Sequence, residues 1–256
     1  MSGAGAVPGS RDLNLVETDA RPCKAAGREV ALIYNGPMNA AADQIASVRI
    51  ELADSEPLIW REVEVPTSIS LKALHEIIQA AFGWENDHLW EFSLGKRRYG
   101  PPNDGGWGPA VANAGKVRLS DLLGPRKTTI GYLYDFGDSW EHRLTVANVR
   151  AGDPDRSYPR YVGGERNGPP EDCGGIPGFY DKLDTAADPD HPDHADIKEW
   201  LGDYDPETVD VASINQAFGR LAGQRRGGKS RTGAKKSAQP RGVVLARRGR
   251  VSQRCA

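Results

Sequence analysis

Residues 48–52, VRIEL, and residues 58–65, LIWREVEV, read as two short strands, the first of which alternates strictly between apolar and polar side chains. Successive side chains of a β-strand point to opposite faces, so a period of two predicts a half-buried strand. The turn-forming residues Ser55-Glu56-Pro57 separate the two stretches, which predicts an antiparallel pair. The ordered body of the protein is therefore expected to begin with this hairpin, near Ile45.

The segment after the hairpin is predicted to be a helix. In residues 71–84, LKALHEIIQAAFGW, the large apolar residues share one helical face. Ser70 is a favourable N-cap, and Gly83 suits the left-handed conformation that commonly ends a helix. The apolar face is expected to pack on the sheet.

Further strands are predicted in the middle of the chain. Alternation over residues 88–94 and 139–149 indicates two of them, and residues 130–134 indicate a third. Residues 96–99 are a candidate return partner of the first. In the strand at 139–149, Trp140 and His142 are expected on the same face.

The C-terminal part of the body is predicted to be helical. Residues 151–178 are dense in glycine, proline and charge and are expected to be irregular. Helices are expected at 179–187, after a cap at Asp190 or His191, and after a cap at Asp210. The buried side of the second is expected to carry Ile197, Trp200 and Leu201. Strands, helix, strands and then helices indicate an α+β fold: a mostly antiparallel sheet with one packed helix after the first hairpin and a C-terminal group of helices.

Composition excludes several classes of protein. The 256 residues contain no apolar run of about eighteen, so no membrane-spanning helix is expected. The first residues lack the basic and apolar segments of a secretory signal. Cys23, Cys173 and Cys255 lie too far apart for a disulfide framework. The sequence predicts a cytoplasmic protein with no membrane contact.

The charge is distributed unevenly. Residues 220–256 hold twelve Lys or Arg and no Asp or Glu, whereas residues 1–219 hold 21 basic and 35 acidic groups. The C-terminal segment is also poor in large apolar residues and so cannot offset the entropy of ordering. We expect a disordered leader at 1–44, one domain at 45–221 and a disordered basic tail at 222–256.

The basic tail has two interpretations. It can contact nucleic acid without sequence preference, through phosphate charges, or it can be a solvated extension without a ligand. No aromatic residue is interleaved to stack on bases. The acidic body favours a basic protein as its own partner. The candidate nucleic-acid contacts are Arg225, Arg226, Lys235, Lys236, Arg247 and Arg248.

Five residues are candidate ligands of a divalent metal: Asp135, Asp138, His142, His75 and His88. Carboxylates and imidazoles are suitable donors, but convergence of all five requires the turn at 135–138 to fold over the apolar face of the following strand. In the alternative, Asp135 closes its own turn and each histidine is a hydrogen-bonded core residue. Periodicity does not decide between these, and the cofactor stays open: the first interpretation implies a divalent metal ion, and the second implies none.

Two other clusters have simpler explanations. His191 and His194 stand three residues apart near a predicted helix start, where the surrounding aspartates act as caps. The run Glu171-Asp172-Cys173-Gly174-Gly175 is interpreted as a structural loop packed on the sheet. Two neighbouring carboxylates raise the pKa of a thiol, which disfavours Cys173 as a nucleophile.

Taken together, several segments resemble the plasmid pRiA4b ORF-3-like family, some members of which are described as TnpR-type passenger proteins of insertion elements. The resemblance runs from about Ile45 to about Leu221. The segments are PLIWREVEVP, LKALHEIIQAAFGWENDHLWEF, RRYGPP, YDFGDSWEHRLTV, PPEDCGG and ADPDHPDHADIKEWLG.

The resemblance implies an α+β domain found on bacterial chromosomes, plasmids and transposable elements, and it implies no reaction. This chain departs from the family pattern twice. Members often carry a cysteine just before PPEDCGG, where this chain has none, and a histidine where this chain has Trp90. Both differences remove groups that bind metals. Two hypotheses follow: an accessory or interaction module associated with mobile DNA, or a metal-dependent hydrolase or nuclease that uses the DFGD-His segment.

Overall fold

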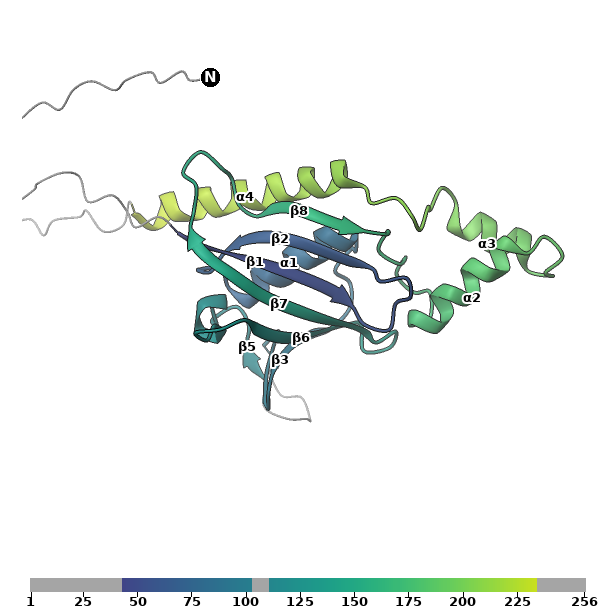
Figure 1. Ribbon diagram of the computed structural model, residues 1–256, viewed down its shortest axis with the longest axis horizontal. Coiled ribbons are helices and arrows are strands. Elements are labelled where there is room, and N and C mark those ends of the chain that lie inside the picture. The colour runs from purple at the N-terminus through teal and green to yellow at the C-terminus, as the bar shows by residue number, and fades with distance from the viewer. Residues whose placement is uncertain (1–42, 103–110, 234–256) are drawn as a thin grey trace, which may run out of the picture. The chain divides into compact units, whose positions relative to one another are not determined.

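The computed structural model describes residues 43–102 and 111–233, with side chains up to Arg225 (Figure 1). Eight strands form one sheet in the order β5-β4-β3-β6-β7-β1-β2-β8. All neighbours in this sheet are antiparallel except β4 and β5. The fold is therefore α+β with a mostly antiparallel sheet, as the sequence predicts. The predicted leader lies almost entirely outside the described residues.

The hairpin that opens the body is confirmed. Strand β1 (Gln44–Leu52) pairs antiparallel with β2 (Trp60–Pro66), and Val48 stands opposite Val63. The alternation places Val48, Ile50 and Leu52 on the buried face. On its other side β1 pairs with β7 (Trp140–Ala151), which makes β1 a central strand.

Helix α1 (Leu71–Phe82) follows the hairpin and covers one face of the sheet (Figure 1). The Ser70 side chain accepts a hydrogen bond from the Ala73 backbone N–H, as expected of an N-cap. Gly83 ends the helix in the left-handed conformation at φ 81°. Both predicted caps are confirmed.

The middle of the chain supplies the other half of the sheet. Strand β3 (Trp90–Leu94) pairs with β4 (Arg97–Gly100), the predicted return strand, and with β6 (Thr128–Tyr134). Strand β5 (Ala112–Asn113) and the 3₁₀ turn η1 (Leu119–Leu122) lie between them in sequence. Strand β7 buries Trp140, His142, Leu144 and Val146 on one face, as the alternation predicts.

The prediction of irregular structure throughout residues 151–178 is wrong. Strand β8 (Arg160–Glu165) forms there and pairs with β2 at the edge of the sheet. Its two central glycines, Gly163 and Gly164, remove the alternation by which a strand is recognised. Helix α2 (Gly175–Ala187) also begins inside this range, four residues before Phe179.

The C-terminal helices differ in detail from prediction. Helix α3 (His194–Leu201) has Asp193 at its N-cap position, not Asp190 or His191, and it contains no buried residue. Trp200, predicted to be buried, is 45 % exposed. The cap at Asp210 is confirmed, because its carboxylate accepts hydrogen bonds from the Ser213 N–H and hydroxyl.

Helix α4 (Val211–Gly233) continues well past Leu221, where the sequence places the start of the basic tail. The buried residues Ile214, Phe218 and Ala222 follow helical spacing and anchor its first half beside β8 and α1 (Figure 1). The first twelve residues of the predicted tail are therefore helical, whereas residues 234–256 lie outside the described chain.

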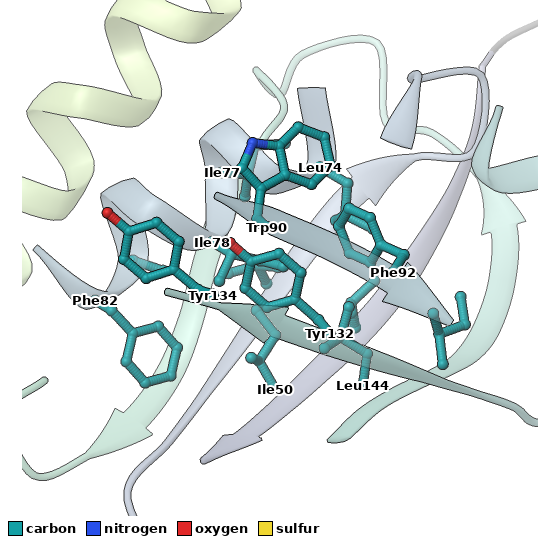
Figure 2. Packing of buried hydrophobic residues seen from close by; sticks show 14 of the residues in the cluster. Ile50, Leu74, Ile77, Ile78, Phe82, Trp90, Phe92, Tyr132, Tyr134 and Leu144 are labelled. Carbon is teal, nitrogen blue, oxygen red and sulfur yellow. The ribbon is translucent and has the colours of Figure 1, made fainter. Parts of the chain in front are cut away.

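The core lies between α1 and the covered face of the sheet. Aromatic rings from β3 and β6 meet the aliphatic side chains of α1, and Figure 2 shows Trp90, Phe92, Tyr132 and Tyr134 facing this layer. The rings of Phe92 and Tyr132 have their centroids 4.8 Å apart. Burial of so many large apolar groups is the main contribution to the stability of the sheet.

One charged residue also lies in this interior. Arg61, in β2, is 1 % exposed. Its guanidinium donates to the carbonyl oxygens of Ala81 at 2.8 Å, Glu165 at 3.0 Å and Arg166 at 2.7 Å. The Ala81 carbonyl belongs to the last turn of α1, where carbonyls lack helical partners and the helix dipole favours a cation. Burial lowers the Arg61 pKa to about 10, so the group stays charged at neutral pH.

We expect Arg61→Met to lower the free energy of unfolding by about 3 kcal/mol, because buried carbonyls lose charged donors and the methionine replaces none of them. Urea denaturation followed by tryptophan fluorescence measures this. The control Arg97→Met, at an exposed position of β4, is expected to change the unfolding free energy by less than about 0.5 kcal/mol. Equal midpoints for the two variants would contradict the role assigned to Arg61.

Candidate functional site

The structure brings together two of the five candidate metal ligands and adds a third residue. His88 lies in the loop between α1 and β3, and its Nδ1 is 3.6 Å from Oδ2 of Asp135 in the β6–β7 turn. Its Nε2 is 3.4 Å from Oδ1 of Asp172, in the loop between β8 and α2. One donor atom from each of the three residues lies within 4.8 Å of the others.

Asp135 is held in place by its own turn. Its Oδ1 accepts a hydrogen bond from the Gly137 N–H at 2.9 Å, and its backbone N–H donates to the Leu89 carbonyl at 2.9 Å. The turn-closing role that the sequence offered as an alternative is therefore present. It leaves Oδ2 directed at His88, so the same carboxylate serves both purposes.

Asp172 is the residue that sequence reasoning missed. It belongs to the run 171–175, which was interpreted as a structural loop, and its side chain is 79 % exposed. The loop meets the segment after α1 through two hydrogen bonds: Trp84 Nε1 donates to the Pro169 carbonyl at 2.8 Å, and the Glu85 N–H donates to Glu171 Oε2 at 2.9 Å. Trp84 and Pro169 are 85 residues apart in the sequence, so no local sequence pattern predicts this contact.

Asp138 is not part of this three-residue cluster and instead contacts the residue before α2. Its Oδ2 accepts a hydrogen bond from the Gly174 N–H at 3.1 Å. A Cβ on Gly175 would lie 2.3 Å from the Asp138 carbonyl oxygen, so only glycine permits this approach. Asp138 thus fastens the 171–175 loop to the sheet, in agreement with the structural interpretation of that loop.

His75 is a buried member of a hydrogen-bonded network. Its Nε2 contacts Asn86 Oδ1, which only accepts, so this nitrogen carries the hydrogen. Its Nδ1 then accepts from the Tyr132 hydroxyl at 2.8 Å, and that hydroxyl accepts from Gln79 Nε2 at 3.0 Å. Trp90 stacks on the imidazole with ring centroids 4.0 Å apart. Both nitrogens are engaged, so His75 is not placed to bind a metal.

His142 is enclosed by aromatic rings. Its Nδ1 donates to the Trp140 carbonyl at 2.9 Å, while its buried Nε2 has no hydrogen-bond partner among the described residues. Phe82, Trp84 and Tyr132 have ring centroids 5.0 to 5.3 Å from its own. No carboxylate of the described chain joins it, so His142 also behaves as a core residue.

Burial lowers the pKa of both histidines. The value for His75 falls to about 4, where burial outweighs the hydrogen bond to Asn86. The value for His142 falls to about 3, where burial outweighs hydrogen bonds with the backbone of Trp140 and Tyr132. Both are neutral in the folded protein at pH 7.

We expect the protein to lose stability as the pH falls below about 6.5, because the unfolded chain then binds protons at these histidines while the folded chain does not. Between pH 7 and pH 5 the loss is about 2 kcal/mol for each histidine. Urea denaturation at the two pH values measures it, and His142→Leu is expected to reduce the pH-dependent loss by about half. An unchanged pH dependence in this variant would show that His142 does not contribute.

A depression of about 500 Å³ opens beside His88. His88, Asp172, Trp84 and Pro169 are among the residues that line it. Glu171 faces Tyr134, whose hydroxyl donates to its Oε1, and burial with this neighbouring carboxylate raises the Tyr134 pKa. Glu171 is therefore occupied on both oxygens and stands beside the three-residue cluster without joining it.

Comparison with known proteins identifies the group to which this chain is related. The family described as plasmid pRiA4b ORF-3-like protein matches residues 44–213. The chain belongs to the plasmid pRiA4b ORF-3-like family. The uncharacterised protein y4hQ of Sinorhizobium fredii is 36 % identical to this chain over 189 residues, which cover 70 % of this chain and 92 % of that protein.

A solved relative of this ORF-3-like chain has the same fold. The crystal structure of a protein of unknown function, MM3350 from Methanosarcina mazei Go1, superposes with a TM-score of 0.62 at 29 % identity. The match covers 67 % of this chain and 97 % of that one. The solved relative supports the fold, and neither relative carries a reaction in its name.

The second notable surface of this ORF-3-like chain is strongly acidic. Residues 181–210, which run from α2 through α3 to the start of α4, are called the acidic arm here. The arm holds eleven Asp or Glu against two lysines, and all eleven are exposed. His194 is directed inward to the Thr185 carbonyl, and His191 accepts from the Asp193 N–H, so these histidines serve the local backbone.

The core anchors the acidic arm at its two ends. Phe179 is 2 % exposed, and the ring of Tyr204 meets it edge-on at 6.2 Å. Lys182 donates to the carbonyl of Cys173 at 3.0 Å. Cys173 itself is a buried free thiol whose pKa burial and the carboxylates of Asp138 and Asp172 raise to about 12, as the sequence led us to expect in direction.

The candidate nucleic-acid contacts of the basic tail are only partly described. Arg225 is half-buried on α4. Burial lowers its pKa, and this outweighs the negative charge of Asp43, which raises it. The side chain of Arg226 is not described, and Lys235, Lys236, Arg247 and Arg248 lie outside the described residues.

None of the described helices has the length and apolarity that a bilayer crossing requires.

Proposed function

We propose that this member of the family is an interaction module that binds a basic, partly apolar protein segment on its acidic arm. The exposure of all eleven carboxylates of the arm carries the proposal. Within the described chain only Glu207 of these eleven forms an ion pair, with Arg166. Asp188, Asp205 and Asp210 accept local hydrogen bonds. The other seven are solvated charges of one sign, which attract a basic partner.

The acidic arm also offers apolar contact. Trp200 is 45 % exposed, and the only cation over its ring in the described chain is Lys182, with Nζ 5.4 Å from the centroid. A depression of about 260 Å³ on the arm is lined by Leu183, Leu201 and Tyr204 among others. An exposed tryptophan and an apolar depression on the same segment are typical of interaction surfaces, and arginine stacks readily on such a ring.

The fold of the arm is consistent with a docking role. Helix α3 has eight residues and buries none of them, so its apolar surface gains little from the rest of the protein. A partner that covers Trp200 and Leu201 would remove this surface from water. Charge would then select basic segments, and the depression would select those that carry a large apolar side chain.

The expected setting of such a module is the cytoplasm. Cys173 as a free thiol supports a reducing compartment. The plasmid in the family's name supports an accessory role associated with mobile DNA, in which the module binds a protein of the same element.

The probe for this proposal is a fluorescent peptide of four Arg-Arg-Leu repeats, titrated with the full chain and followed by fluorescence anisotropy. We expect Trp200→Ala to weaken binding about tenfold, because it removes the aromatic platform. The double change Asp196→Lys and Glu199→Lys is expected to weaken binding by a similar factor at low salt.

Two controls isolate the arm. Asp155→Lys makes one such charge reversal at an exposed site outside the arm and is expected to change affinity less than about twofold. A peptide of Arg-Arg-Ser repeats is expected to bind more weakly than the leucine peptide. If Trp200→Ala and the double change bind the leucine peptide as well as the unaltered chain does, the arm is not the docking surface.

The contact of the basic tail with nucleic acid remains a separate proposal. Residues 234–256 contain seven Lys or Arg and no acidic residue, so retention on random double-stranded DNA is expected to fall steeply with salt. A chain that ends at Gly233 keeps every described element and is expected to lose this retention. Equal retention of both chains would show that residues 234–256 do not contribute to DNA binding.

A further inference from the structure

We propose that His88, Asp135 and Asp172 form a binding site for a divalent transition-metal ion, with zinc as the preferred ion. This inference goes beyond the interaction role and does not depend on it. It rests on three side chains from three loops of the fold, which lie after α1, after β6 and after β8.

The donor atoms lie within a small side-chain movement of the spacing that a bound ion requires. Ligand atoms around a four-coordinate zinc at about 2.0–2.2 Å lie roughly 3.3–3.6 Å from one another. An imidazole gives one ion a single nitrogen, and the two short separations involve different nitrogens of His88: Nδ1 lies 3.6 Å from Asp135 Oδ2, and Nε2 lies 3.4 Å from Asp172 Oδ1. With one donor atom from each residue, the three atoms all lie within 4.8 Å of one another. The three residues are thus close enough to share one ion while neither carboxylate forms a short hydrogen bond with the imidazole.

One side of the proposed site is fixed and the other is open. The Asp135 side chain is 12 % exposed and is oriented by its hydrogen bond from the Gly137 N–H, which leaves Oδ2 available. The imidazole of His88 packs edge-on against Tyr134, with ring centroids 5.8 Å apart. Asp172 is exposed, so its carboxylate can turn toward an ion that enters from solvent. A fixed pair with one mobile ligand provides both orientation and access.

Hydrogen bonds of the backbone and of side chains outside the cluster bring the three loops together without help from an ion. Trp84 and Glu85 bind the 169–171 segment, and the Asp135 N–H binds the Leu89 carbonyl next to His88. The remaining coordination positions would be filled by water, because Glu171 is already engaged by Tyr134 and by the Glu85 N–H. The depression beside His88 gives that water room.

The chemistry of the donors selects the class of ion. One imidazole nitrogen and two carboxylate oxygens suit zinc and related transition metals. Calcium takes six to eight oxygen ligands, and magnesium retains most of its water, so neither gains much from a histidine. Zn²⁺ is therefore expected to bind more tightly than Mg²⁺ or Ca²⁺.

The test is isothermal titration of the chelator-treated full chain with Zn²⁺. We expect the unaltered chain to bind one zinc ion. In Asp135→Asn and in Asp172→Asn we expect the zinc affinity to fall about tenfold or more, or binding to be lost. The first change keeps the acceptor for the Gly137 N–H and removes only the charge that faces His88. The second affects a side chain that is 79 % exposed and is expected to leave the unfolding midpoint in chelator unchanged.

The matched control is the double change His191→Gln and His194→Gln. These two histidines also lie among carboxylates and are therefore an alternative set of zinc ligands. It is expected to leave the zinc affinity unchanged. The proposal is overturned if the two asparagine variants bind zinc as the unaltered chain does, if the control abolishes binding, or if no stoichiometric binding occurs. Peptide binding by the acidic arm is expected to be the same with and without chelator, so either proposal can fail alone.

Discussion

The guanidinium of Arg61 is the contact on which the arrangement of the loops depends. It joins the last turn of α1, through Ala81, to the end of β8, through Glu165 and Arg166. Both segments lead directly into the loops that carry His88 and Asp172. A buried cation held by carbonyls alone is costly to create and costly to disrupt, so it enforces one geometry. Gly168 then passes so close to the end of α1 that a Cβ would lie 2.2 Å from the Phe82 carbonyl oxygen.

The aromatic core holds the same loop from its other side. Asn86, two residues before His88, binds the buried imidazole of His75, and Tyr132 and Gln79 complete that network. His75 thereby helps to position the loop, and both it and His142 remain neutral because burial disfavours their charged forms. The half-exposed His88 is the one histidine near the core that keeps its ring directed at carboxylates rather than at the core. The different roles of these histidines follow from their burial. The buried polar groups stabilise the loop, whereas the polar groups at the edge of the core face solvent.

Sequence periodicity was sufficient for the parts of the fold that depend on local patterns. The β1–β2 hairpin, the two caps of α1 and the buried face of β7 all follow from side-chain alternation or from the residue required at a cap. It failed at β8, where glycines replace the pattern, and at Trp200, which the helical spacing places on the apolar face although the residue is 45 % exposed. It also failed at Asp172. The nearness of this residue to His88 depends on the pairing of β8 with β2, which is a long-range contact that no spacing reports.

Electrostatics relates the two proposed sites without making them one. The body of the chain carries a large excess of negative charge, which raises the local concentration of any cation near its surface. That field acts alike on a basic peptide and on a metal ion, so attraction alone identifies neither ligand. Geometry distinguishes them. The arm spreads its carboxylates over two helices beside a tryptophan, which suits an extended basic chain. The three loops instead concentrate one imidazole and two carboxylates within 4.8 Å, which suits a single ion. Long-range charge therefore explains why this surface attracts cations, and the short-range placement of His88, held by the contacts of Arg61 and Asn86, explains where one would stay.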